Sequence, residues 1–192
     1  MAISGRLKEF LDAAKVKYSA LKHPVVYTAQ EIAAAQHVPG RQLAKSVLVK
    51  TDAGPVLVVL PAIALIDVKK LKALLRAKTA TIAKEADIKE RFPDVEVGAM
   101  SPFGNLYSVP VAVDRSLEAA EEIVFNAGSH TDTIKMRFRD FAALAKPKAG
   151  AFTKPIGGQA AKKKRGATKR AAARPRPASS VRRRAKRSTR RR

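Results

Sequence analysis

Residues 45–60, KSVLVKTDAGPVLVVL, contain two aliphatic runs on either side of the tripeptide DAG at 52–54. β-Branched residues favour strands, and a short connection with Asp and Gly is typical of a tight turn between antiparallel neighbours. This stretch therefore predicts a β-hairpin with strands at 45–51 and 55–60.

Capping signals and apolar patterns place helices and further strands around this hairpin. Thr28-Ala-Gln-Glu31 has the form of a capping box, in which the Thr28 hydroxyl accepts from the Glu31 amide. Asp67 and Ser4 precede apolar positions with helical spacing, and each is expected to cap one helix. Beyond the helix that Ser4 begins, helices are expected at 29–36, 67–77, 85–92, 116–122 and 140–145, and strands at 16–21, 79–83, 109–114, 122–126 and 133–137. The mixture predicts one α+β domain with a mixed or antiparallel sheet and surrounding helices.

Charge is distributed unevenly along the 192 residues, which carry 39 Lys+Arg against 16 Asp+Glu. Residues 151–192 hold 17 of the basic residues and no acidic one, and Gly, Ala and Pro are frequent there. Such a segment buries too little apolar surface to offset the entropy of ordering, so we expect an ordered domain over 1–148 and a disordered basic tail over 149–192. A polycation attracts nucleic acid. The expected tail contacts are Lys162, Lys163, Lys164, Arg165, Arg182, Arg183 and Arg184.

The composition excludes several classes of protein. There is no Cys, so disulfides, thiolate zinc sites and Cys nucleophiles are absent. The sequence contains no HExxH, GxSxG, Walker A or Rossmann motif, and we expect no metal or cofactor. No apolar run reaches the roughly 18–20 residues of a membrane span, and the first residues lack the apolar core of a signal peptide. A cytoplasmic location without a membrane partner is therefore expected, and an enzyme of this composition would work through positioning and oriented dipoles.

Three separated blocks carry a family resemblance. They are HPVVYTAQEIAAAQHVPGRQLAKSVLVK (23–50), VGAMSPFGNLYSVPVAVD (97–114) and VFNAGSHTDTIKM (124–136). The second block contains a GxxxP loop, Gly98-Ala-Met-Ser-Pro102. In order and spacing, across roughly 10–145, the blocks resemble the YbaK/prolyl-tRNA synthetase-associated editing domain family.

The resemblance implies an aminoacyl-tRNA deacylase that acts in trans. Members of the family hydrolyse the ester of wrongly charged tRNA, either as an insertion in prolyl-tRNA synthetase or as free-standing proteins. A binding pocket rejects a smaller side chain by only about 1–3 kcal/mol per methylene, so a second hydrolytic site is needed. The implied partners are mischarged tRNA, above all tRNA(Pro), and prolyl-tRNA synthetase or an elongation factor.

The resemblance also assigns roles to residues that have simpler explanations. A lysine at a strand end is commonly only solvated, but Lys45 matches the family lysine thought to hold the phosphate of the terminal adenosine. Gly98–Pro102 fits a plain turn as well as a loop whose backbone surrounds the aminoacyl group. The catalytic residues implied are Lys45, Gly98, Ser101, Pro102 and His130. The substrate-binding residues implied are Thr28, Tyr27, Ala99, Met100, Phe103, Gly104, Asn126, Gly128 and Ser129.

The residue at 133 bears on the amino acid that is removed. The cysteine-editing branch of the family carries an aspartate three residues beyond the position of His130, where this chain has Thr133. Together with His130, this favours alanine over cysteine, and serine remains open. Two alternatives to the enzyme are a nucleic-acid-binding protein that works through its tail and a regulatory module that retains the fold without activity.

Overall fold

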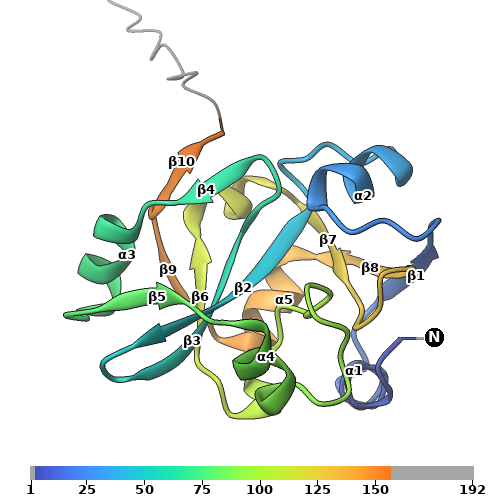
Figure 1. The fold of residues 1–192 in the computed structure, drawn as a ribbon. Helices are drawn as coiled ribbons and strands as arrows, with labels where there is room; N and C mark the ends of the chain where they lie inside the picture. The colour runs from blue at the N-terminus through green and yellow to red at the C-terminus, as the bar shows by residue number, and fades with distance from the viewer. Residues whose placement is uncertain (1–2, 157–192) are drawn as a thin grey trace, which may run out of the picture. The chain divides into compact units, whose positions relative to one another are not determined.

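A five-stranded mixed sheet forms the centre of the computed structural model, which describes residues 3–156 (Figure 1). Its strand order is β5-β2-β3-β6-β9. The predicted hairpin forms its middle, because β2 and β3 pair in antiparallel register from Ala44↔Pro61 to Thr51↔Gly54. β6 and β9 extend the sheet in parallel, and β5 pairs with β2 at the other side. The strand bounds are β2 (Ala44–Thr51), β3 (Gly54–Pro61), β5 (Ala80–Ile82), β6 (Val111–Asp114) and β9 (Lys148–Gly150).

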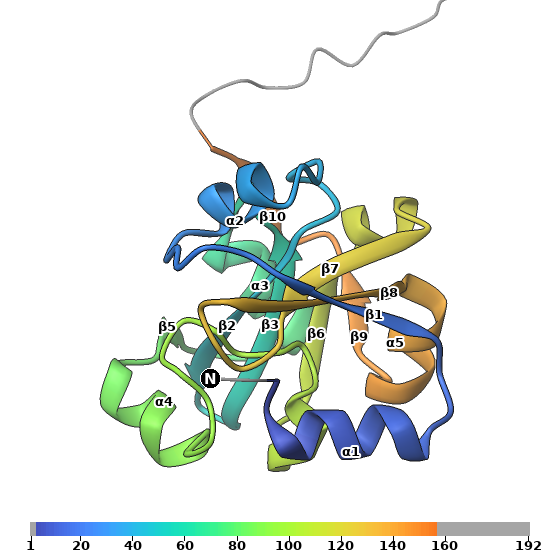
Figure 2. The ribbon, with the colours of Figure 1, turned by 90° about the vertical axis from the view of Figure 1, so that its right-hand side faces the viewer.

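Two smaller sheets complete the β structure. β1 (Tyr18–Lys22), β8 (Asp132–Arg137) and β7 (Glu122–Asn126) form an antiparallel sheet in the order β1-β8-β7, which crosses in front of the central strands in Figure 2. β4 (Ala64–Ile66) and β10 (Thr153–Pro155) form a two-stranded antiparallel ribbon. The predicted α+β class with mixed and antiparallel sheets is therefore confirmed.

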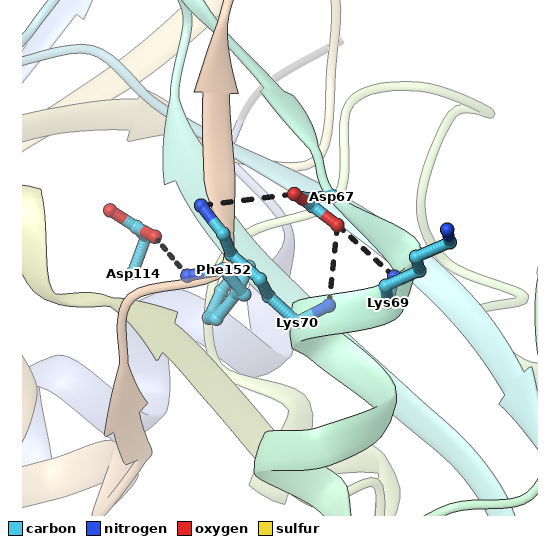
Figure 3. Close-up of polar contacts among 5 residues, drawn as sticks. All are labelled: Asp67, Lys69, Lys70, Asp114 and Phe152. Atoms are coloured by element: carbon cyan, nitrogen blue, oxygen red, sulfur yellow. Dashed lines mark hydrogen bonds and ion pairs between the residues drawn. The ribbon is translucent and has the colours of Figure 1, made fainter.

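Side-chain caps explain where α2 and α3 begin. The predicted capping box is present at α2, where the Thr28 hydroxyl accepts from the Glu31 N–H at 3.2 Å and the Glu31 carboxylate accepts from the Thr28 N–H at 3.0 Å. Asp67 caps α3 by accepting from the backbone N–H groups of Lys69 and Lys70 (Figure 3). The helices are α1 (Gly5–Ala13), α2 (Ala29–Ala35), α3 (Val68–Leu75), α4 (Glu85–Arg91) and α5 (Phe138–Ala145), with 3-10 turns η1 (Gly104–Tyr107) and η2 (Arg115–Ala119).

Two helix predictions need correction. Ser4 precedes α1, but its hydroxyl donates to Asp94 at 2.7 Å and makes no hydrogen bond with the helix. The Asp94 carboxylate, far away in the sequence, orients the Ser4 hydroxyl away from the N-terminus of the helix. The helix expected at 116–122 is only the 3-10 turn η2, because β7 begins at Glu122 and leaves no room for a longer helix.

Phe103 lies at the centre of the main core. It is fully buried, and its ring makes edge contacts with Phe10, Phe125 and Phe141 at centroid distances of 5.5, 5.8 and 5.5 Å. These partners come from α1, β7 and α5, so one side chain joins two helices to the three-stranded sheet. No helix within residues 3–156 is both long enough and apolar enough to cross a bilayer.

The ordered chain continues beyond 148, where composition placed the start of the tail. Phe152 is fully buried, and its N–H donates to Asp114 at 2.9 Å (Figure 3). Its carbonyl accepts from the Asp67 N–H at 2.8 Å. β9 and β10 flank it, so residues 149–155 belong to the fold. One buried phenylalanine and paired backbone outweigh a composition that is otherwise typical of disorder. The tail contacts expected from 162 onward lie outside the described residues.

We expect Phe152→Ala to lower the free energy of unfolding by about 3–5 kcal/mol, because it leaves a cavity beneath the central sheet. Urea unfolding of the full chain, followed by circular dichroism, measures this change. Ile156→Ala is the control, since Ile156 is exposed and should change stability little. Equal, small effects of both substitutions would show that the 149–155 segment does not stabilise the domain.

Candidate active site

A small cavity of about 30 Å³ lies where α2, β2, the loop after Val97 and the end of β7 meet. It is lined by Tyr27, Ala29, Ile32, Leu43, Ala44, Lys45, Ser46, Gly98, Met100 and Asn126. Lys45 and Gly98, which are far apart in the sequence, thus border the same hollow. A volume of this size has room for about two water molecules or a small side chain.

Lys45 contributes a half-buried cation to this cavity. Its Nζ donates to the Ala62 carbonyl at 3.3 Å, and no ion pair among residues 3–156 includes it. Desolvation by burial lowers the pKa of Lys45 from its ordinary value. An ammonium has three donors, and the Ala62 carbonyl takes one of them, so Lys45 can bind an anionic group such as a phosphate.

The loop at 97–100 is held against the turn that follows β7. The Gly128 N–H donates to the Ala99 carbonyl at 3.1 Å, and the Glu96 N–H donates to the Gly128 carbonyl at 3.0 Å. Asn126 adds a longer contact, from its side-chain amide to the Gly98 carbonyl at 3.4 Å. Gly98 has φ +91°, a conformation that glycine adopts without strain. The loop therefore presents a fixed stretch of main chain to the cavity.

His130 lies behind this loop. Its Nε2 is 3.0 Å from the Val97 carbonyl, its backbone N–H donates to the Glu96 carboxylate at 2.8 Å, and its ring lies 4.9 Å from that of Tyr27. A nitrogen facing a carbonyl must be the donor, so in the neutral ring Nδ1 is left as an acceptor. His130 does not line the cavity itself, but its Cε1 lies next to Gly98.

Unpaired polar atoms gather at this site. Within residues 3–156, four buried side-chain nitrogen or oxygen atoms have no hydrogen-bond partner in the protein: Ser46 Oγ, Asn126 Oδ1, His130 Nδ1 and His23 Nε2. Ser46 and Asn126 line the cavity, and His130 contacts its wall. An unpaired buried polar group costs about 1–3 kcal/mol, so three in one place indicate a site that a ligand or water completes.

Ser46 is a site residue that the sequence analysis missed. It follows Lys45 in an otherwise aliphatic strand, and its hydroxyl is buried. A hydroxyl in such a run is the signal that could have found it, since strand interiors seldom contain polar groups without a purpose. The other lining residues that the sequence analysis missed are apolar: Ala29, Ile32, Leu43 and Ala44. The hydrophobic pattern alone could not distinguish residues that line the cavity from residues of the core.

Several predicted loop residues lie in the core and do not line the cavity. Ala99, Ser101, Pro102 and Phe103 are buried, and Phe103 is the centre of the aromatic cluster described above. Gly104 packs so closely on the Val109 carbonyl that a Cβ there would come within 2.6 Å of it. These residues support the loop from behind.

The remaining predicted residues hold the backbone of the site. Thr28 uses its hydroxyl in the capping box of α2 and does not border the cavity. Gly128 pairs with the 96–99 segment, and the buried Ser129 hydroxyl donates to Asp132 at 2.8 Å. Of the fourteen residues predicted from the sequence within the domain, the five that the structure brings together around the cavity are Tyr27, Lys45, Gly98, Met100 and Asn126.

Comparison with known proteins identifies the family. The model of the aminoacyl-tRNA editing domain family matches residues 23–144. The chain belongs to this family. The chain is accordingly an aminoacyl-tRNA deacylase. No curated protein matches the sequence significantly.

Solved structures show the same editing-domain fold. One is a protein proposed to be a trans-editing enzyme for prolyl tRNA synthetase, with 19% identity and a TM-score of 0.70, over 80% of this chain and 97% of that one. Another is hypothetical protein APE2540, with 18% identity and a TM-score of 0.71, over 78% of this chain and 99% of that one.

Gly98→Ala is expected to lower deacylation at least about tenfold, because a side chain at φ +91° strains the loop and moves its main chain. Gly54→Ala is a matched control: Gly54 also has positive φ (+117°), and a Cβ there meets open space in the β2–β3 turn. Both variants should lose about 1–2 kcal/mol of stability. Only Gly98→Ala should lose activity in a single-turnover deacylation assay, and equal activities would contradict a role for this loop.

Proposed function

We propose that the editing domain hydrolyses mischarged tRNA in trans and that its main substrate is Ala-tRNA(Pro). The observation that carries the proposal is the cavity of about 30 Å³ shared by Lys45, Gly98 and Met100. Membership in the editing family supports hydrolysis of an aminoacyl-tRNA ester, and the cavity supports a small aminoacyl group. A prolyl ring is larger than an alanyl methyl, so the correctly charged tRNA is excluded by size.

The proposed complex places the acylated 3′ end between Lys45 and the loop. The Lys45 ammonium binds the phosphate of the terminal adenosine as a point charge. The backbone N–H groups of Gly98 and Met100 donate no hydrogen bond to another residue among 3–156, which leaves them available for the ester carbonyl. Donors fixed in advance stabilise negative charge on that oxygen in the transition state, an effect worth about 3–4 kcal/mol where water is excluded.

Hydrolysis in this complex needs one water molecule. The water oxygen attacks the ester carbonyl carbon, the bond from that carbon to the terminal ribose oxygen breaks, and the ribose oxygen leaves with a proton. The products are free amino acid and tRNA with an intact 3′ end. The unpaired acceptors Ser46 Oγ and Asn126 Oδ1, both on residues that line the cavity, can position the water, with help from the neighbouring 2′-hydroxyl of the substrate.

Alanine is favoured over cysteine by the absence of a carboxylate at 133. Thr133 is buried, pairs in register with Asn126, and its hydroxyl donates to the Leu21 carbonyl at 3.4 Å. The position next to the site therefore carries a neutral side chain. A deacylation assay on tRNA(Pro) charged with alanine, serine, cysteine or proline tests this proposal. Fastest hydrolysis of the alanyl ester is expected, and faster hydrolysis of the cysteinyl ester would contradict it.

Lys45→Ala is expected to lower the deacylation rate by about tenfold to a hundredfold, the loss of one hydrogen bond from a charged group. The fold should persist, because Lys45 makes no ion pair among residues 3–156, and circular dichroism checks this. Lys50→Ala is the control from the same strand, since Lys50 is exposed and pairs with Asp87 at 2.8 Å. Full activity of Lys45→Ala on Ala-tRNA(Pro) would contradict the assignment of Lys45 to substrate binding.

A second role, nucleic-acid binding by the C-terminal segment, is favoured by its charge. Residues 157–192 contain 16 Lys+Arg and no Asp or Glu. A chain that ends at Ile156 should bind tRNA more weakly at low salt and show a shallower dependence of log Kd on log salt, because fewer counterions are released. Filter binding over a salt series measures the slope. Equal slopes for the two chains would rule out contact between the segment and the tRNA backbone.

A further inference from the structure

A second hollow adjoins Lys45. It is an apolar groove of about 380 Å³, and its lining residues come from β2, β3, β4, β5, β10 and the start of α3. Figure 1 labels these elements. Its lining residues are Lys45, Val47, Leu60, Leu65, Ile66, Val68, Ile82 and Lys154. Lys45 and Val47 share one face of β2, and Leu60 lies opposite Lys45 in the hairpin register. The groove is therefore continuous with the candidate active site through one side chain.

Exposed aliphatic side chains concentrate here. Among residues 3–156, large hydrophobic side chains are exposed at seven positions, and three of these, Leu65, Val68 and Ile82, line the groove. Two more, Ile63 and Ile156, lie at the ends of the β4–β10 ribbon, where the Ile156 N–H donates to the Ile63 carbonyl. A clustered apolar surface on a small, highly charged protein marks a binding site more often than chance exposure does.

The charge around the groove selects an anionic occupant. Two lysines and no acidic residue line it. The carboxylate of Asp67, the N-cap residue just before α3, accepts from two backbone N–H groups and lies 3.7 Å from the Lys70 ammonium (Figure 3). These hydrogen bonds and the charges of Lys70 and Lys154 lower its pKa, so this carboxylate is already compensated by its own neighbours. The described chain ends at Ile156, directly after β10, and every charged side chain in the sequence beyond it is basic. A polyanion with an apolar component, such as a nucleic-acid strand, is complementary to this surface, whereas a neutral or basic protein face is not.

We propose that the groove binds the nucleotide that precedes the terminal adenosine in the single-stranded 3′ end of the tRNA. Its base lies on the aliphatic floor formed by Leu65, Val68 and Ile82, and the phosphodiester that joins it to the terminal adenosine lies between Lys154 and Lys45. The subsite rests on the proposed function, since it needs the acylated adenosine at Lys45. With no aromatic residue in the lining, the base is held by burial of apolar surface and not by stacking, so the identity of the base matters little.

Two alanyl esters test the subsite in the full chain. The first is an alanylated minihelix that carries the acceptor end of the tRNA, and the second is 3′-O-alanyl-adenosine, which lacks the preceding nucleotide. We expect Leu65→Gln, Ile82→Gln and Lys154→Ala each to raise the KM of the minihelix about threefold to tenfold, with kcat unchanged, at about 200 mM salt where backbone attraction is damped. Hydrolysis of alanyl-adenosine should not change.

Control variants and a direct binding measurement accompany the kinetics. Lys17→Ala removes one exposed charge just before β1, and Val25→Gln changes an exposed aliphatic residue outside the groove. Neither should alter the minihelix KM. Fluorescence anisotropy with uncharged minihelix should show the same increase in Kd for the groove variants as the KM values do, and Lys154→Arg should restore much of the affinity.

Each other outcome overturns the subsite. An unchanged minihelix KM in all three groove variants would do so, as would an equal loss on both esters, which would place these residues in the aminoacyl cavity or in the fold. If the wild-type chain hydrolyses neither ester, the proposed function fails, and an unchanged Kd for the uncharged minihelix separately overturns the groove. Loss of affinity for purified prolyl-tRNA synthetase with an unchanged minihelix Kd would show that the groove binds a protein.

Discussion

The site depends on a short parallel contact between Leu43 and Val124, which joins the two larger sheets. The Val124 N–H donates to the Gln42 carbonyl at 2.9 Å, and the Ala62 N–H donates to the Leu43 carbonyl at 2.8 Å. In a parallel contact, residues two positions further along both strands remain neighbours on the same face. These residues are Lys45 and Asn126, and both line the small cavity.

The surrounding core is closed and apolar, whereas the cavity carries unsatisfied polar groups. Three buried polar atoms have no partner within the described part of the chain, and burial lowers the pKa of the Lys45 ammonium. The Phe103 cluster packs behind the loop that borders these groups. In the proposed complex, the phosphate contacts the Lys45 ammonium, and the donors and acceptors that the fold leaves open contribute to substrate binding.

Local interactions in this protein were predictable from the sequence, and interactions between distant segments were not. The β2–β3 hairpin and the capping box at Thr28 depend on residues within a few positions of one another, and both appear as expected. The Ser4 cap failed because its hydroxyl binds Asp94, ninety residues away. β9 and β10 have three residues each and pair with strands that are distant in the sequence, so no local sequence pattern could predict them.

The candidate site was likewise predictable in part: its motifs could be found in the sequence, but the packing of their side chains could not. The family motifs located Lys45 and the Gly98–Pro102 loop, but they could not show that the loop has two faces. Gly98 and Met100 border the cavity, while Phe103 turns into the core and fixes their position. Ser46 lies inside the first of the three blocks, but the resemblance gave it no role, and only the folded chain shows its hydroxyl buried without a partner among residues 3–156. Motifs thus identify the chemistry of a site, whereas packing decides which of their residues reach it.

Lys45 lines both the small cavity and the apolar groove, so one cation can contact a ligand that occupies both. In the proposed complex, the phosphodiester that joins the terminal adenosine to the preceding nucleotide is the one charged link between the acylated end and the rest of the tRNA. A cation at the boundary of a small cavity and an apolar groove can hold that link while each hollow takes the uncharged group on its own side. Partial burial of the ammonium lowers its pKa and also reduces competition from water for the phosphate. One lysine can therefore set the distance between the ester and the RNA strand, which is the dimension that decides whether the ester carbonyl meets the loop at Gly98.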